Sequence, residues 1–228
     1  MVVGNGLLAN AFKHYENDDQ VIIFASGVSN SKETNEEEYE RECELIKTVP
    51  EDKLLVYFST CSMYDYSIQN SRYVRHKMLM ERMVKWQSER SIVFRLPNVV
   101  GPTNNPHTFF NHFKNKILSG DDLSVQFLSS RHLIDIKDVS DLCTLIIEKE
   151  KKVLNPFNLK IEIGFDNETS VEDIVKMMLQ ILNKNNKINI EGMGSNYTFP
   201  KKQCEEYMKE FNYVVPENYT YNLLKKYL

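Results

Sequence analysis

Two residues in the segment YVRHK have the types and the spacing of an acid/base pair. Tyr73 and Lys77 stand four positions apart, which places both side chains on one face of a helix. An ammonium group beside a phenol favours the phenolate and lowers the phenol's pKa from about 10 towards neutrality. A phenol tuned in this way can give and take a proton in alcohol–ketone chemistry. The pair therefore predicts an acid/base site.

The spacing alone is a weak signal, because Tyr-x-x-x-Lys occurs twice more, starting at Tyr197 and at Tyr221, where a solvated helix surface explains it. The first pair differs because its lysine lies in an apolar stripe, where a core helix would carry a hydrophobic side chain. The preceding segment LLVYFST ends in hydroxyl residues, and α/β sheets bind ligands at the carboxyl ends of their strands. We therefore expect the first pair to be functional. Its stripe consists of Tyr73, Lys77, Met80 and Val84.

A glycine turn opens the chain. The segment GNGLLA places Gly4, Gly6 and Ala9 in the G-x-G-x-x-G/A arrangement that holds a pyrophosphate, although a plain strand-to-helix turn explains it about as well. The arrangement also requires an acid about 20 residues later to bind the adenosine ribose, and the segment FASG at that distance has none. Either VIIFAS is the second strand, with Ser26 or Ser29 near the ribose, or the second and third strands are missing.

The elements that must position these residues alternate along the chain. Apolar runs at 21–26, 54–60 and 91–101 have the length of buried strands, and segments of helical period separate them. Continuous apolar strands between helices indicate a parallel sheet covered on both faces. We predict an α/β fold with a Rossmann-like doubly wound parallel sheet, followed by a small mixed lobe.

Amino-acid composition argues against several classes of protein. The 228 residues are 42% hydrophobic with a net charge of −4, which argues against nucleic-acid binding. No apolar run reaches the ~20 residues of a membrane span, and no leader pattern precedes the first strand. The cysteines are scattered without metal-binding or disulfide spacing, so we expect no metal site and a reducing, cytoplasmic location. They are Cys43, Cys61, Cys143 and Cys204.

Several motifs occur in an order that resembles a known family. GNGLLA, FSTCSMYD, YVRHK, FRLPNVVGP and RHLIDIKDVSD follow one another as in extended short-chain dehydrogenase/reductases. More narrowly, the chain resembles the NAD-dependent epimerase/dehydratase family that acts on nucleotide sugars. FNLKIEIGFDNETSVEDIVKMM is similar to that family's substrate lobe. The resemblance implies a cofactor domain at 1–103 that 131–150 rejoin, and a substrate-binding lobe at 104–130 and 151–228.

The resemblance also implies roles for single residues. Tyr73 matches the catalytic acid/base, Thr60 the hydroxyl that orients the sugar oxygen, and Lys77 the lysine that holds the nicotinamide ribose. Arg131 matches a basic residue that meets the nucleotide diphosphate, a role that suits the planar guanidinium. Further cofactor-binding positions are Gly4, Gly6, Leu7, Leu8, Ala25, Ser26 and Pro97, with Tyr73 and Lys77. Further substrate-binding positions are Ser29, Ser62 and Asn98, with Arg131.

The positions at which this chain departs from the family pattern indicate which reactions and which parts of the cofactor site to expect. Dehydrating members have Asp-Glu directly after this threonine, where this chain has Cys61 and Ser62, so dehydration is not expected. The 13 positions from Thr60 to Tyr73 make a short loop, as in the compact reductases of deoxysugar and capsule pathways. If FASGVSNS is the family's fourth strand with its loop, no room is left for the second and third strands. The adenosine half would then be cut away.

Three functions remain open at this point. The first is a nucleotide-sugar reductase or epimerase that acts on a keto-sugar with NADP or NAD, in which Tyr73 is the acid/base. The second is a binding or regulatory protein that kept the fold and lost the cofactor, since fold does not imply function. The third is a cofactor-independent isomerase. The resemblance implies a homodimer through the helices at 35–49 and 73–87. His76 is expected at the surface or in that interface, and His132 in a structural role.

Overall fold

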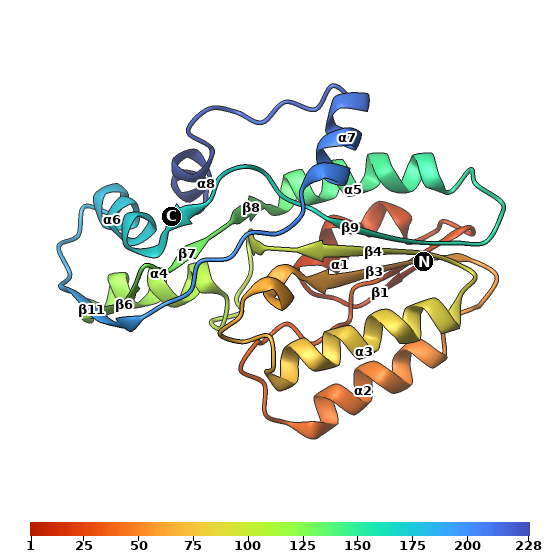
Figure 1. The fold of residues 1–228 in the computed structure, drawn as a ribbon, viewed down its shortest axis with the longest axis horizontal. Helices are drawn as coiled ribbons and strands as arrows, with labels where there is room; N and C mark the ends of the chain where they lie inside the picture. The colour runs from red at the N-terminus through yellow and green to blue at the C-terminus, as the bar shows by residue number, and fades with distance from the viewer.

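Five parallel strands form the central sheet of the computed structural model, which describes all 228 residues. Their order is β1-β2-β3-β4-β9, and Figure 1 shows the strands side by side across the middle of the molecule. All seven residues of β3 are buried, because it has a strand on each side and helices on both faces. The bounds are β1 Val2–Val3, β2 Val21–Phe24, β3 Leu54–Thr60, β4 Arg90–Leu96 and β9 Phe157–Glu162.

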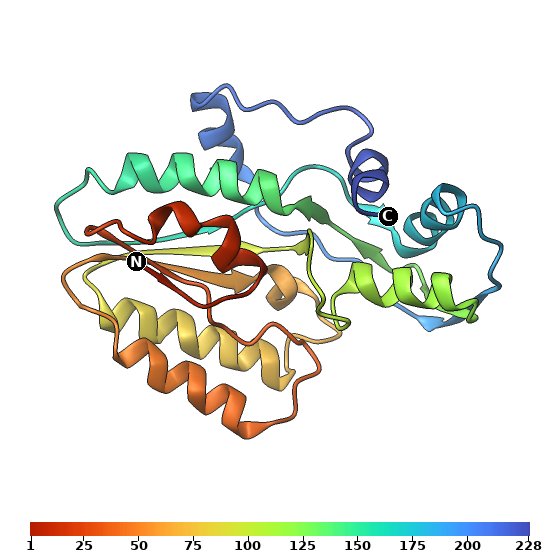
Figure 2. The ribbon, with the colours of Figure 1, turned by 180° about the vertical axis from the view of Figure 1, so that it is seen from behind.

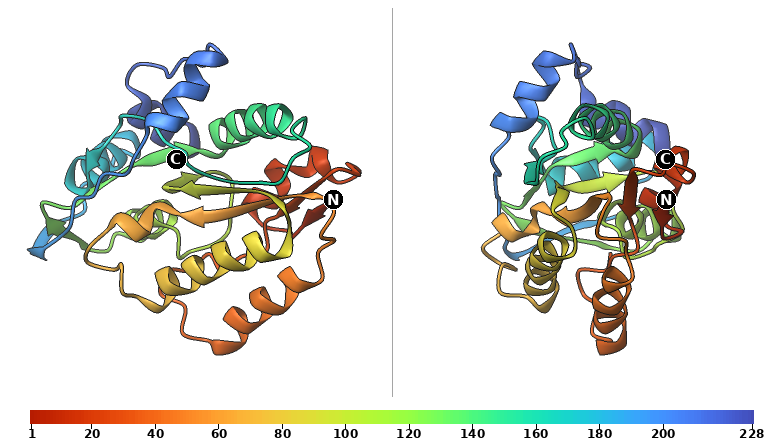
Figure 3. Two further views of the ribbon diagram at one scale, coloured as in Figure 1. Left: turned by 45° about the vertical axis from the view of Figure 1, so that its right-hand side comes forward. Right: turned by 90° about the vertical axis from the view of Figure 1, so that its right-hand side faces the viewer.

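Helices cover both faces of this sheet. The helices α2 (Glu36–Lys47) and α3 (Arg72–Gln87) lie side by side on one face, as Figure 3 shows. The opposite face carries α1 (Leu7–Ala11) and α5 (Ile136–Glu150), which are in front in Figure 2, together with α7 (Lys202–Glu210) over β9. The apolar faces of these helices pack on the strands in two separate cores. The predicted α/β fold with a Rossmann-like parallel sheet is confirmed.

The sheet order runs in one direction only. A doubly wound sheet reverses its order next to the first strand, so that the second and third strands lie on that strand's far side. Here β1 pairs only with β2, through Val2 with Ile23 and Val3 with Phe24, and is the edge of the sheet. Of the two alternatives left open for VIIFAS, the structure therefore supports the truncated sheet. The Met1 amino group holds this edge by donating hydrogen bonds to three backbone carbonyls, those of Tyr15, Asp18 and Val21.

A second, smaller body contains three short two-stranded sheets and three helices around its own core. It lies at the carboxyl side of the central strands, on the left in Figure 1. Its strands are β5 Asn98–Val100 with β8 Leu133–Asp135, β7 Ser130–Arg131 with β10 Thr169–Ser170, and β6 Leu123–Phe127 with β11 Ile188–Met193. Its helices are α4 Phe109–Ser119, α6 Val171–Ile181 and α8 Tyr219–Tyr227.

Part of the segment assigned to the lobe packs with the central sheet instead, since α7 lies over β9. Residues 157–162, which we assigned to the lobe, form β9 and pair in parallel with β4 in the central sheet. The apolar face of that strand completes the main core, where Ile161 is fully buried. The rest of the division into a cofactor domain and a substrate lobe stays a prediction. No helix has the length and apolar character needed to cross a membrane.

Candidate active site

Thr60 and Tyr73 meet at the carboxyl end of β3. Thr60 ends that strand, and its hydroxyl accepts a hydrogen bond of 3.0 Å from the Ser62 backbone N–H. Tyr73 lies in the first turn of α3, which Ser71 caps by accepting from the Val74 N–H. Burial raises the pKa of Tyr73 to about 12, and the nearby Thr60 hydroxyl opposes that rise. The two predicted residues therefore lie near each other, and their shared role stays a prediction.

Lys77 is engaged elsewhere, in a buried group that we call the Glu42 network: Glu42, Tyr57, His76 and Lys77. The Lys77 ammonium donates to the Tyr57 hydroxyl at 2.9 Å and to Glu42 Oε1 at 3.4 Å. The Tyr57 hydroxyl donates to the same Oε1 at 2.6 Å. Glu42 Oε2 accepts from the Val28 N–H at 2.7 Å and lies 2.9 Å from His76 Nε2. Glu42 has no solvent exposure and Lys77 only 3%.

The charges in this network compensate each other. Burial alone would raise the pKa of Glu42, but the Lys77 ammonium and three hydrogen bonds outweigh it and lower that pKa to about 2. Burial lowers the pKa of Lys77, and the Glu42 carboxylate opposes that shift. Burial and the same carboxylate raise the pKa of Tyr57. Glu42 and Lys77 therefore form a buried ion pair whose hydrogen bonds are satisfied within the protein.

The predicted lowering of the Tyr73 pKa is wrong in this structure. The Lys77 hydrogen bonds go to Glu42 and Tyr57, so the ammonium does not contact the Tyr73 hydroxyl. The charge that acts on Tyr73 is the Glu42 carboxylate, which raises the pKa of the phenol further. Tyr73 is therefore a neutral phenol at pH 7.

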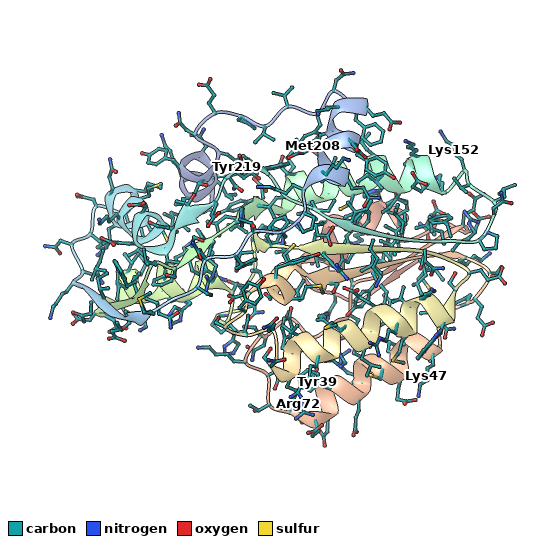
Figure 4. The ribbon with its side chains drawn as sticks, in the orientation of Figure 1. Tyr39, Lys47, Arg72, Lys152, Met208 and Tyr219 are labelled. Atoms are coloured by element: carbon teal, nitrogen blue, oxygen red, sulfur yellow. The ribbon has the colours of Figure 1, made fainter.

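The sequence predicted His76 at the surface or in a dimer interface, and this prediction is wrong, because His76 is buried. Only 7% of it is exposed, because its ring lies between Glu42 and the edge of the Tyr39 ring, with centroids 4.7 Å apart. Tyr39 in turn carries the Arg72 guanidinium 4.5 Å above its ring, and Figure 4 shows these two residues at the amino-terminal ends of α2 and α3. The predicted stripe of α3 is otherwise buried as expected, Met80 and Val84 included.

The residues predicted to bind a cofactor lie around the glycine turn. Gly4 has a φ of +127°, and a Cβ there would lie 2.6 Å from the Ala25 carbonyl oxygen, so only glycine fits. An added Cβ at Gly6 would meet open space. Ser26 is bound by Arg41, which donates to its hydroxyl at 2.9 Å and to its carbonyl at 3.1 Å.

Three other residues that we predicted to bind a cofactor pack against neighbouring parts of the protein. A Cβ added to Gly101 would lie 2.9 Å from Leu7, so this leucine packs against the strand end after β5. Leu8 packs on the main core. Pro97 lies beside Gly164 at the junction of β4 and β5.

The residues predicted to bind substrate are spread along the carboxyl edge of the sheet. Asn98 donates from its backbone and side chain to the His132 carbonyl, at 3.1 and 3.4 Å. Ser29 accepts from the Asn105 amide at 3.3 Å. Arg131 donates to the carbonyls of Ser130 and Ser195, at 2.6 and 3.4 Å.

Residues 194–200 cross this edge between β11 and α7, and Figure 1 shows the segment in front of the strands. Tyr197 and Phe199 pack on Cys61, directly after Thr60. The Ser195 hydroxyl donates to the buried Asp65 carboxylate at 2.6 Å. Burial raises the pKa of Tyr197, and Cys61 adds to that rise while the Arg131 charge opposes it. Arg131 itself donates to the Ser195 carbonyl of this segment at 3.4 Å. Residues 194–200 therefore contact both Cys61, next to Thr60, and Arg131.

Sequence reasoning missed Glu42, Tyr57 and Asp65. A signal for Glu42 was present, because it lies between Tyr39 and Ile46 on the buried stripe of α2. We interpreted the acids of this helix only as first-turn residues. An acid in the apolar stripe of one helix, beside a lysine in the apolar stripe of the next, predicts a buried pair. Tyr57 gave no signal, because a tyrosine in a central strand is ordinary packing.

The fold defines a Rossmann-like α/β protein, with a threonine and a tyrosine hydroxyl at the carboxyl edge of its sheet. The sequence matches the model of the NAD dependent epimerase/dehydratase family over residues 4–161. The chain belongs to that family. No match was found among curated protein sequences.

Solved structures of similar fold are nucleotide-sugar enzymes. A dTDP-glucose 4,6-dehydratase from Bacillus anthracis in complex with NAD is 20% identical with a TM-score of 0.66, over 99% of this chain and 77% of that one. A UDP-glucuronic acid 4-epimerase from Bacillus cereus in complex with UDP-glucuronic acid and NAD is 17% identical with a TM-score of 0.66, over 95% and 78%. A UDP-galactose 4-epimerase is 16% identical with a TM-score of 0.68, over 97% and 80%.

Three observations test whether these residues fit the family's dinucleotide, which binds at the point where the strand order reverses. The sheet has no such reversal, because β1 is its edge. The helix after the glycine turn has only five residues. Lys77, which by resemblance would hold the nicotinamide ribose, is bound to Glu42 and Tyr57. The glycine turn is open, but the set as a whole does not fit a complete dinucleotide.

Proposed function

We propose that this chain binds a nucleotide sugar at the carboxyl ends of β3 and β4, with the sugar ring against Thr60 and Tyr73. The observation that carries the proposal is the position of Thr60 at the carboxyl end of β3 with Tyr73 nearby in the first turn of α3, at the edge of a parallel sheet where α/β proteins bind ligands. Arg131 is the candidate for the diphosphate, because a guanidinium fork matches phosphate oxygens. Asn98, Ser29 and Ser62 line the same edge and are candidates for further substrate contacts.

The chemistry that these residues support is proton exchange at a sugar oxygen. Thr60 orients the oxygen through its hydroxyl, and Tyr73 donates or accepts the proton. On a keto-sugar this is the acid/base half of a reductase or epimerase reaction. Hydride transfer in such a reaction is the part that a nicotinamide cofactor, NADP or NAD, supplies in this family. The four free cysteines agree with the cytoplasmic location expected for that activity.

A second candidate is favoured by a specific observation. Lys77 is paired with Glu42, and the sheet has no strand beyond β1 on which the adenosine half could lie. Both features favour a family member that binds a nucleotide sugar without a redox cofactor, as a binding protein or as a cofactor-independent isomerase. The two candidates share the sugar site and differ in whether they bind a dinucleotide.

Thermal unfolding of the full chain separates the two candidates. The probes are UDP-glucuronic acid, dTDP-glucose, NAD, NADH, NADP and NADPH, each at millimolar concentration. A ligand at about 100 times its Kd stabilises by about 2.7 kcal/mol, which for a chain of this size is roughly 5 to 10 °C. A shift with a nucleotide sugar alone favours the cofactor-free candidate. Shifts with a nucleotide sugar and with one dinucleotide favour the reductase or epimerase.

Substitutions test whether a rise in unfolding temperature comes from ligand binding at the proposed site. Arg131→Ala should lower affinity for the nucleotide sugar at least tenfold, because a charge-assisted phosphate contact is lost. Arg82→Ala, an exposed arginine on α3, is the matched control and should leave the affinity unchanged. Where turnover of a keto-sugar nucleotide is found, Tyr73→Phe should abolish it. No shift with either nucleotide sugar, or undiminished turnover by Tyr73→Phe, would refute the proposal.

A further inference from the structure

The Lys77 ammonium donates hydrogen bonds to two anchors, and neither of them is Tyr73. One is the Tyr57 hydroxyl on β3 and the other is Glu42 on α2. The backbone after β2 closes over them, since a Cβ at Gly27 would lie 2.5 Å from Lys77 Nζ and 2.9 Å from Glu42 Oε1. With 3% exposure, Lys77 has no solvent to replace either anchor.

Tyr73 is correspondingly without a cation. The groups that act on it are the Thr60 hydroxyl from β3 and, from α2, the Glu42 carboxylate and the Tyr39 phenol. Tyr197 from the crossing segment and Tyr57 from β3 also face it. None of these groups is positively charged. The groups around Lys77 are, besides its anchors, Glu81 on its own helix and His76, which binds the far oxygen of Glu42.

We propose that Glu42 competes with Tyr73 for Lys77 and so holds the acid/base pair in an inactive arrangement until the lysine is released. While Glu42 binds the ammonium, Tyr73 keeps its proton and can only donate a hydrogen bond. When the ammonium turns from Glu42 to the phenol, its charge favours the phenolate, and Tyr73 loses its proton to solvent. A ligand releases the lysine only by binding more tightly to the released state.

This device rests on the proposed function, because it regulates the same Thr60–Tyr73 site. It explains why a family acid/base residue is a neutral phenol in this chain. The coupling has a definite direction: removing the carboxylate charge of Glu42 should free Lys77 and make Tyr73 more acidic. That direction can be tested without any ligand or turnover.

The experiment follows tyrosine ionisation by NMR in full-length protein labelled with ¹³C at tyrosine Cζ. The Tyr73 signal is assigned by its loss in Tyr73→Phe. Between about pH 6 and pH 11 the wild-type signal should stay at the phenol position, since burial keeps its pKa at about 12. In Glu42→Gln the midpoint should fall by about 1 to 3 pH units and enter this range. Glu162→Gln, a buried acid bound to Arg95 and Tyr64, is the control and should behave as wild type.

Two further variants make the result decisive. Glu42→Asp keeps the charge but draws it back from Lys77, and should shift the midpoint in the same direction by less, which covers the case where Glu42→Gln does not fold. Glu42→Gln combined with Lys77→Met should restore the wild-type signal. If the shift persists in the double variant, Glu42 acts on Tyr73 directly and the competition for Lys77 is refuted. An unshifted Tyr73 in folded Glu42→Gln or Glu42→Asp refutes the proposal outright. Because no ligand is used, these outcomes are independent of whether a nucleotide sugar binds.

Discussion

Glu42 and Lys77 are charged residues placed in the apolar stripes of two neighbouring helices. Each would be costly to bury alone, because the charged form loses its hydration. Together they are tolerated, since the carboxylate accepts hydrogen bonds from Tyr57 and the Val28 N–H as well as from the ammonium. Removing one partner of such a pair leaves the other buried and uncompensated, which is more damaging than removing both.

This pairing predicts an acid-labile contribution to stability. The folded pKa of Glu42 is about 2, below the value of 4.5 for a free glutamate. A lowered pKa stabilises the folded state above about pH 4.5, and the stabilisation is lost as pH falls towards about 2. The difference in pKa corresponds to about 3 kcal/mol. Urea unfolding should therefore show that Glu42→Gln is less stable than wild type at pH 7 and that the gap narrows from about pH 5 to pH 3. A gap that does not depend on pH would contradict the ion pair.

A second prediction at this scale concerns Gly27. A Cβ there overlaps Lys77 Nζ and Glu42 Oε1, so Gly27→Ala must displace the ion pair or the loop after β2. Such overpacking costs about 1 to 3 kcal/mol. Gly6→Ala is the matched control, because its added Cβ meets open space at a φ of −82°; it should cost only the preference of an N-cap for glycine over alanine, about 0.5 to 1 kcal/mol. Thermal unfolding measures both, and equal stability of the two variants would contradict the close approach at Gly27.

At the scale of elements, the sequence specified strands and helices because each carries its own local signal. The runs VIIF, LLVYFST and RSIVFRL became β2, β3 and β4, and α6 begins at a local cap, with Ser170 accepting from the Asp173 N–H. What each element contacts could not be predicted in the same way. The Glu42 network depends on how α2 packs against α3, and β9 depends on a pairing with β4 that no local pattern encodes. The sequence was therefore wrong about the partners of Lys77 and the burial of His76, and the role of Thr60 and Tyr73 as a site stays a prediction.

The cap of α3 gives a prediction at this scale. Ser71 accepts a hydrogen bond from the Val74 N–H and so fixes the first turn, which carries Tyr73. Ser71→Ala should cost about 1 kcal/mol and speed hydrogen exchange in residues 72–75. Thr108→Ala removes the equivalent cap of α4, where Thr108 accepts from the Asn111 N–H, and is the matched control. It should cost a similar free energy and leave exchange in α3 unchanged. Unaltered exchange at 72–75 in Ser71→Ala would show that packing alone holds this turn.

At the scale of the whole molecule, the truncated sheet sets the limits of function. The reversal of strand order that creates a dinucleotide crevice is missing, while the carboxyl edge that meets the smaller body is complete. The molecule therefore keeps the carboxyl edge that meets the smaller body and has no strands beyond β1. For this reason a complete dinucleotide fits the sheet less well than the proposed nucleotide sugar does.

We predict that the outer face of α2 and α3 forms the interface of a homodimer. On α3, Leu79 and Trp86 stand seven positions apart on one stripe and are 43% and 76% exposed, which is unusual for side chains of this size. The exposed residues of α2 are mostly acidic and those of α3 include Arg75, Arg82 and Lys85, so a two-fold arrangement can set α2 of one copy against α3 of the other. Sedimentation equilibrium should find a dimer that weakens as salt screens these charges and dissociates in Trp86→Lys. Leu154→Lys, at an equally exposed leucine away from these helices, is the control and should remain dimeric. A wild-type monomer at all concentrations tested would refute the prediction and leave the Leu79 and Trp86 stripe as surface.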